Sequence, residues 1–246
     1  MLYDKKMKSS CFTNRTHKVA ISFGTEFKDD VSFQKSLWPD KAKEEKLQNF
    51  YRFCAENNIP SEKLGILSFS LEPGSEKMRI ITEPDVNLFD RTDKLGNVII
   101  TDVPDITLMG WAADDCLVGL SSADGRVRAV VRVSVISMNE QNIIATAAKA
   151  MRKFGVEPES VCAYVSQCVG ECCFKYDPYE AVLVALKREG INNIEHAFAK
   201  NSRCTVCSRD IFGAYMHHSW GRQTCLDRDG SVVHYNGQYC LTISKL

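Results

Sequence analysis

Two carboxylates and a thiol stand side by side in the segment from Asn97 to Leu120, NVIITDVPDITLMGWAADDCLVGL. They are Asp114, Asp115 and Cys116. A cysteine thiolate can act as a nucleophile or a metal ligand, and a neighbouring carboxylate can tune its charge or offer an oxygen ligand. Carboxylates inside an apolar segment are costly to bury unless they are partnered. This segment is therefore the first candidate for an active site, and the alternative is an acidic surface turn beside an unreactive core cysteine.

The composition indicates an ordinary globular protein and excludes several classes of partner. The 246 residues are 44% hydrophobic, and 31 acidic residues balance 31 basic ones. This balance argues against a bulk electrostatic affinity for nucleic acid or for an anionic membrane. The chain has no apolar run long enough to span a bilayer, and its first residues lack the apolar core of a signal peptide. We therefore expect a cytoplasmic protein with no membrane or nucleic-acid partner.

The chain has eleven cysteines. An odd number in a reducing compartment predicts free thiols rather than a disulfide framework. Five cysteines form two clusters, which are Cys168, Cys172 and Cys173, and the C-x-x-C pair Cys204 and Cys207. A structural zinc site needs four converging ligands, and one C-x-x-C beside an adjacent pair is an incomplete signal for it. No metal ligand is assigned from these cysteines, and a structural zinc or a thiol-based sensor is kept as an alternative.

The candidate segment must be positioned by strands. The β-branched and apolar residues of 98–100 and 106–109 predict two buried strands joined by a tight turn. The segment from Arg126 to Val135 predicts a further strand, with Arg126, Arg128 and Arg132 on one parity. Charge with a period of two usually marks the solvated face of a sheet, so we interpret these arginines as an exposed face.

The rest of the chain alternates strands and helices. Helices are expected over 43–57, 142–154 and 179–189, the last two ended by Gly155 and Gly190. Strands are expected over 17–24, as the first strand of the core, and over 161–165. Hairpins are expected over 64–82 and over 232–243, the second around Asn236-Gly237. No linker or repeat divides the sequence, which predicts one mixed α/β domain spanning residues 1–246.

Several segments in the same order resemble the laccase-domain family, the YfiH-like proteins. IITDVPDITLMGWAADDCLVGL is similar to the family's strand pair that ends in A-D-C, with Cys116 at the cysteine. Residues 163–174, AYVSQCVGECCF, are similar to the segment G-P-x-I-x-x-C-C-Y, and Cys204-Thr205 opens a segment similar to the C-T…T-G-R motif that ends here at Gly221-Arg222. The resemblance extends over most of the chain.

The resemblance implies a single-domain, layered α/β/β/α sandwich with mixed sheets. It also implies a shallow site where one cysteine and two histidines bind zinc or copper. The corresponding segments here read SLEPG at 70–74 and RVSVIS at 132–137, and no histidine occurs between His17 and His196. Glu72, Asp114 and Asp115 are the remaining candidate oxygen donors, but hard carboxylates match a soft thiolate site poorly. We therefore expect a degenerate metal site centred on Cys116, and no cofactor is assigned.

Two functions follow from the resemblance. The first is a diverged enzyme related to purine nucleoside phosphorolysis or deamination, which would take a small nucleoside or phosphate ligand. In that enzyme Cys116 is the nucleophile or residual ligand, Asp115 tunes it, and Arg222 with His217 holds an anionic group. The second is a non-catalytic binding or regulatory paralogue that keeps the fold, in which Arg222 packs or caps and His217 is a surface residue.

Overall fold

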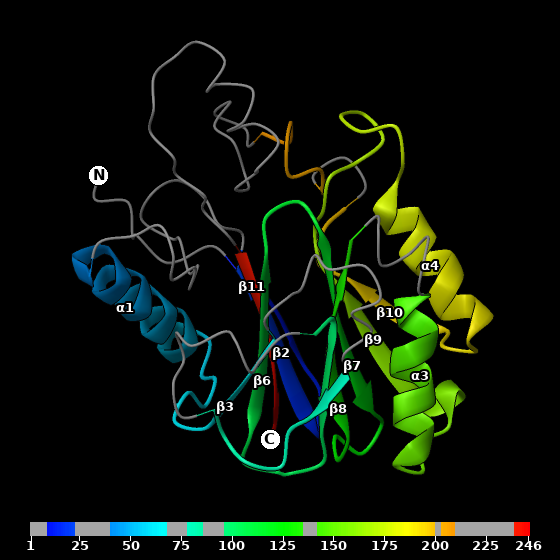
Figure 1. Cartoon of the computed structure of the whole chain (residues 1–246), viewed down its shortest axis with the longest axis horizontal. Coiled ribbons are helices and arrows are strands. Elements are labelled where there is room, and N and C mark those ends of the chain that lie inside the picture. The colour runs from blue at the N-terminus through cyan, green and yellow to red at the C-terminus, as the bar shows by residue number, and fades with distance from the viewer. Residues whose placement is uncertain are drawn as a thin grey trace.

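The computed structural model describes residues 9–22, 40–67, 78–85, 96–134, 142–199, 203–209 and 239–246. In this part of the chain the strands form two sheets, and helices cover their outer faces (Figure 1). The helices are α1 (Asp40–Glu56), α3 (Ile143–Lys153) and α4 (Pro178–Arg188), with a short 3-10 turn, η1 (Pro158–Ser160). The expected helices are thus confirmed, with bounds within three residues of those predicted.

One sheet has the strand order β1-β2-β11-β6-β3. Its strands are β1 (Ser9–Thr13), β2 (His17–Ser22), β11 (Tyr239–Lys245), β6 (Thr107–Ala112) and β3 (Leu64–Leu67). Helix α1 covers the outer face, where Phe50, Phe53 and Cys54 pack on a buried cluster that includes Ile66 and Trp111. The amphipathic spacing of these helix residues explains why this helix docks on a sheet.

The other sheet has the order β10-β9-β7-β8-β5-β4. Its strands are β10 (Asn193–His196), β9 (Val161–Val165), β7 (Cys116–Ser122), β8 (Arg128–Val133), β5 (Val98–Thr101) and β4 (Met78–Ile80). Helices α3 and α4 cover its outer face with a cluster that includes Ile144, Met151 and Leu186. A third cluster, including Leu108 and Val130, fills the space between the sheets. The layers are α/β/β/α, and the strands pair in mixed directions, as the resemblance implies.

The helix boundaries follow from local residues. Asn142 caps α3 by accepting a hydrogen bond from the Ala145 amide at 3.4 Å, and Gly155 follows the helix with a φ of +74°. Asp177 caps α4 by accepting bonds from the amides of the second and third residues after it, and Gly190 follows α4 with a φ of +87°. A glycine at a positive φ after a helix is the usual C-terminal stop.

The hairpin predicted over 64–82 is wrong. Its two strands are present, but β3 pairs in parallel with β6 in one sheet, and β4 pairs in parallel with β5 in the other. Similarly, β5 and β6 are the buried strands expected in the central segment, but the turn between them connects the two sheets. Strand β1 was not predicted, so β2 is not the first strand of the core. The turn at Asn236-Gly237 lies outside the described residues.

The exposed face predicted for Arg126, Arg128 and Arg132 is also wrong for the two arginines that lie in β8. Arg128 is 0% exposed and Arg132 is 8% exposed. Strand β8 has β7 and β5 on its two sides, helices on one face and the other sheet on the opposite face, so it has no solvated side. The guanidinium of Arg128 is held by backbone carbonyl groups, including those of Val103 at 2.6 Å and Gly125 at 2.8 Å.

None of the described helices has the length and apolar character needed to cross a bilayer.

Candidate functional site

Cys116 is the first residue of β7, and Asp114 and Asp115 form the turn that joins β6 to it. The side chain of Cys116 is fully buried in the cluster beneath α3 and α4. Its sulfur lies 3.8 Å from the carbonyl oxygens of Leu117 and Ser166, and 4.0 Å from the Ser166 hydroxyl. The thiol is therefore placed inside the core, against polar backbone groups.

The nearest thiol to Cys116 is that of Cys168. A hydrogen bond with Cys116, together with burial, raises the pKa of Cys168 well above its ordinary value. The two histidines within the described ranges are engaged elsewhere: His17 Nε2 lies 2.6 Å from the Tyr164 hydroxyl, and His196 Nδ1 lies 2.5 Å from the Tyr179 hydroxyl. Within the described residues, the Cys116 sulfur is in contact with polar groups of Leu117, Ser166 and Cys168.

Asp115 is ion-paired with Arg132 of the adjacent strand β8. The guanidinium donates two bonds to one carboxylate oxygen, from Nε at 2.7 Å and from Nη2 at 2.5 Å. The side chain of Arg132 is only 9% exposed, and that of Asp115 is 27% exposed. The ion pair explains why a carboxylate is stable beside buried Cys116, because its negative charge compensates the positive charge of the buried Arg132.

Asp114 connects the turn to a distant segment. Its carboxylate accepts a hydrogen bond from the Thr205 hydroxyl at 2.6 Å, and its carbonyl accepts one from the Val169 amide at 2.9 Å. The same loops are joined to each other through Cys168, whose amide donates to the Arg203 carbonyl and whose carbonyl accepts from the Thr205 amide. The segments 166–174 and 203–209 therefore form one layer over the start of β7.

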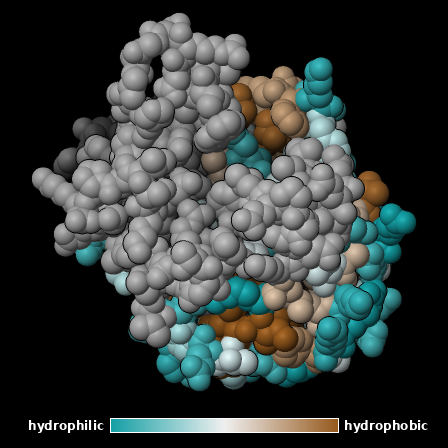
Figure 2. Space-filling view, viewed as in Figure 1, coloured by the Kyte–Doolittle hydropathy of each residue, from teal (hydrophilic) through white to brown (hydrophobic). Residues whose placement is uncertain are grey.

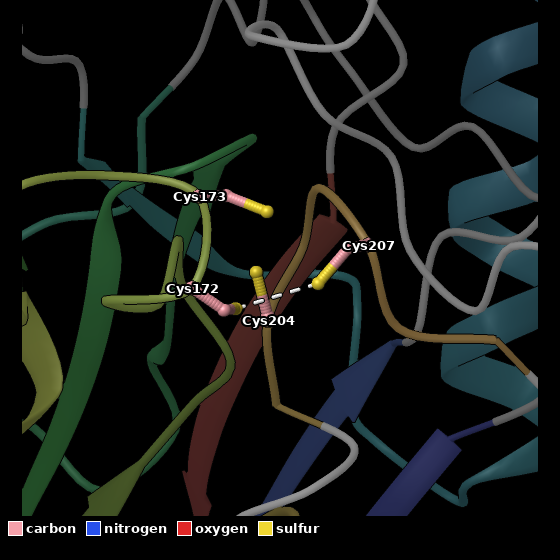
Figure 3. A group of neighbouring side chains, drawn as sticks. All are labelled: Cys172, Cys173, Cys204 and Cys207. Carbon is pink, nitrogen blue, oxygen red and sulfur yellow. Dashed lines mark hydrogen bonds between the residues drawn. The ribbon is translucent and has the colours of Figure 1, made fainter.

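Those two segments bring four cysteines together. The sulfurs of Cys172, Cys173, Cys204 and Cys207 all lie within 4.8 Å of one another. Figure 3 shows their sulfurs pointing into one space, two from each segment. Cys168, which the sequence grouped with Cys172 and Cys173, points instead into the core beside Cys116. The ten cysteines within the described ranges are free thiols.

An open cavity of about 400 Å³ adjoins this four-cysteine cluster. Its lining includes Cys172, Cys204 and Cys207, with Arg203 and Arg209. Figure 2 shows apolar surface at the upper edge of the molecule, where segments 166–174 and 203–209 lie in Figure 1. The described exposed residues of apolar type there are Cys172, Cys173, Phe174 and Cys207. The cluster is thus accessible to a small ion from solvent.

The structure brings Cys116, Asp115 and Asp114 together as the sequence predicts. Glu72, His217 and Arg222 lie outside the described residues, so their predicted roles stay predictions. Sequence reasoning missed the partner of Asp115. The pairing depends on the antiparallel register of β7 and β8, in which Leu117 lies opposite Arg132, and no sequence signal gives that register.

No family model and no curated protein matches the chain. Among solved structures, it is similar to a DUF152 protein from Neisseria meningitidis, with a TM-score of 0.68 and 15% identity over 98% of this chain and 99% of that one. It is also similar to the hypothetical protein YfiH from Bacillus licheniformis, with a TM-score of 0.69 and 15% identity over 93% of this chain and 92% of that one. YlmD from Geobacillus stearothermophilus matches with a TM-score of 0.68 and 14% identity over 93% of this chain and 91% of that one. The chain therefore has the fold of the DUF152, YfiH and YlmD proteins, the laccase-domain family.

Proposed function

We propose that this chain is a binding or regulatory paralogue with the YfiH-like fold, in which the turn at Cys116 is a structural joint rather than a reaction centre. The observation that carries the proposal is the complete burial of the Cys116 side chain, with Ser166 and Cys168 as its polar neighbours. A nucleophilic thiol needs access for its substrate and a group that favours the thiolate.

The surroundings of Asp115 support the same proposal. A carboxylate that tunes a catalytic thiol should face it, whereas the oxygen Oδ2 of Asp115 accepts two bonds from Arg132. Asp114 likewise accepts a hydrogen bond from Thr205 and thereby joins two loops. Both carboxylates satisfy buried donors, which is how folds retain polar groups at the end of a core strand.

The competing function is the diverged nucleoside enzyme, which the resemblance to the laccase-domain family suggests. In that function Cys116 reacts or binds a metal, and His217 with Arg222 supplies the anion site. The two functions predict opposite results for one substitution, Cys116→Ala.

The test is turnover of adenosine and of inosine, each with inorganic phosphate, by the purified full chain and by Cys116→Ala. The matched control is Cys54→Ala, which removes a thiol that is equally buried, in the layer beneath α1. Our proposal predicts no turnover that depends on Cys116, together with a similar loss of stability in the two variants, on the order of 1 kcal/mol each. Turnover by the native chain that disappears in folded Cys116→Ala and persists in Cys54→Ala would refute it.

A further inference from the structure

We propose that Cys172, Cys173, Cys204 and Cys207 bind one divalent zinc ion as a tetrathiolate site. This inference goes beyond the proposed function and does not depend on it, because the four sulfurs are distinct from Cys116.

Each pair of cysteines is presented by its own turn. After Gly170, the amides of Cys173 and Phe174 both donate to the Gly170 carbonyl at 3.0 Å, which closes a turn that carries Cys172 and Cys173. In the second turn the Ser208 amide donates to the Cys204 carbonyl at 3.1 Å. Structural zinc sites usually take cysteine ligands at C-x-x-C spacing, which the turn from Cys204 to Cys207 has, and the fold brings the adjacent pair Cys172 and Cys173 opposite it.

Hydrogen bonds of the backbone hold the two turns in register. Cys168 and Cys204 form a parallel bridge, and Gly170 donates its amide to the Cys204 sulfur at 3.3 Å. A Cβ atom on Gly170 would lie 3.4 Å from the sulfur of Cys172 and 3.6 Å from that of Cys204. The absence of a side chain at Gly170 therefore keeps the space beside these sulfurs open.

The distances suit a single ion. Zinc binds thiolate sulfur at about 2.3 Å in tetrahedral geometry, which separates neighbouring sulfurs by about 3.8 Å. Here all four sulfurs lie within 4.8 Å of one another, and those of Cys172 and Cys207 are 3.4 Å apart (Figure 3). In a [4Fe–4S] cluster each cysteine binds a different iron, and in a [2Fe–2S] cluster two cysteines bind each of two irons, so both clusters require a wider spread of sulfurs.

A backbone donor orients one of the four sulfurs. The Cys204 sulfur accepts a hydrogen bond from the Gly170 amide at 3.3 Å, and hydrogen bonds of this kind hold metal ligands in place. All four thiols must lose their protons to bind a divalent ion, so we expect zinc binding to weaken at low pH.

The four cysteines differ in their exposure to solvent. Cys204 is 5% exposed and lies at the base of the cluster, whereas Cys172, Cys173 and Cys207 are exposed. Three ligands can therefore close on an ion that arrives from solvent. Binding of this kind is typical of a structural site that joins loops, here 166–174 with 203–209.

The first test is metal content and cobalt binding of the reduced full chain. We expect one zinc per chain after purification, and intense visible absorption bands of tetrahedral thiolate-bound Co²⁺ that one equivalent of zinc abolishes. Cys172→Ser and Cys207→Ser are expected to weaken zinc binding at least tenfold. Both substitutions are at exposed positions, and circular dichroism checks that each variant folds.

The matched controls are Cys11→Ser, at an exposed cysteine on β1, and Cys116→Ala, at the buried thiol. Both should keep one zinc per chain. The proposal is overturned if the reduced chain takes up neither zinc nor cobalt, or if it contains several irons with inorganic sulfide. It is also overturned if zinc is retained in the double variant Cys172→Ser with Cys207→Ser, or is lost in Cys116→Ala alone.

Discussion

His17 is a buried histidine whose neutral form the fold requires, and this makes the stability of the chain sensitive to acid. The ring lies at the start of β2 with 0% exposure. Its Nε2 lies 2.6 Å from the Tyr164 hydroxyl, and its Nδ1 lies 3.0 Å from the Thr16 hydroxyl. One hydroxyl can donate to the neutral ring and the other can accept from it, whereas a doubly protonated ring would offer two donors. Burial, and secondarily the charge of Arg128, lowers the pKa of His17 from 6.5 to about 4.

The sign of the effect follows from this lowered pKa. The unfolded chain takes up a proton on His17 below pH 6.5, and the folded chain takes it up only near pH 4. The stability that His17 contributes is therefore present above pH 6.5 and is lost as the pH falls toward 4. Linkage between these two pKa values gives a loss of about 2 kcal/mol between pH 7 and pH 5. Solvent screening reduces the expected loss to about 1 to 2 kcal/mol.

The assay is urea unfolding with reductant at pH 7 and at pH 5, on the native chain and on His17→Gln. Carboxylates also titrate in this range, so the quantity of interest is the difference between the two proteins. We expect the advantage of the native chain over His17→Gln to shrink by about 1 to 2 kcal/mol at pH 5. His196→Gln is the matched control, because His196 is exposed and also contacts a tyrosine hydroxyl. Equal pH dependence in the native chain and in His17→Gln would refute the reasoning.

Three further predictions concern the buried arginines and the cysteine cluster. Arg128→Met leaves the carbonyls of Val103 and Gly125 without this donor, so we expect the free energy of unfolding, measured in urea, to fall by about 3 kcal/mol. Because the charge of Arg128 lowers the pKa of His17, the same substitution should raise that pKa, which NMR titration measures. Asp115→Asn leaves the charge of Arg132 uncompensated and should lower stability by about 1 to 3 kcal/mol, whereas Asp105→Asn, in an exposed pair with Lys63, should change it by less than about 0.5 kcal/mol. Zinc at about 100 times its dissociation constant should stabilise the reduced chain by about 2.7 kcal/mol, or about 5 to 10 °C in Tm. At the same zinc concentration Cys172→Ser, with binding weakened at least tenfold, should keep at most about 1.4 kcal/mol of this stabilisation.

The helices and most strands could be predicted from the sequence because their signals are local. Asn142, Gly155 and Gly190 mark helix ends by local preferences, and they do so in the structure, where Asp177 adds a cap that the sequence analysis does not name. The register of strand pairs is not local. Short apolar runs such as 64–67 and 78–80 do not indicate which sheet they join. The sequence therefore favours a hairpin over 64–82, which is wrong because the two strands lie in different sheets.

The arginines of β8 show a second limit of pattern reading. A charge on alternate residues usually means solvent on one face, but the face of β8 that carries Arg128 and Arg132 is covered by the other sheet. A long side chain can be buried when the ends of neighbouring strands offer carbonyl oxygens or a carboxylate. Those acceptors are Val103, Gly125 and Asp115, which belong to three different turns, and only the folded topology brings them together.

The candidate site could be predicted only in part, because its local features are visible in the sequence and its long-range contacts are not. Asp114, Asp115 and Cys116 are consecutive in the sequence, and their predicted position at a strand end is confirmed. Their partners, Thr205 and Arg132, are 91 and 17 residues away and could not be identified from spacing. The convergence of two cysteine clusters likewise depends on the parallel bridge between Cys168 and Cys204.

These long-range partners connect the two parts of the site. Thr205 lies between two of the cluster's cysteines, Cys204 and Cys207, and its hydroxyl donates to Asp114 at 2.6 Å. An ion that fixes the turn from Cys204 to Cys207 therefore also fixes the donor that holds the β6–β7 turn, two residues before Cys116. The proposed coupling has two links, which are the metal bonds proposed for Cys204 and Cys207 and the hydrogen bond from Thr205 to Asp114. Zinc bound at the four-cysteine cluster would therefore also order the strand end that carries Cys116.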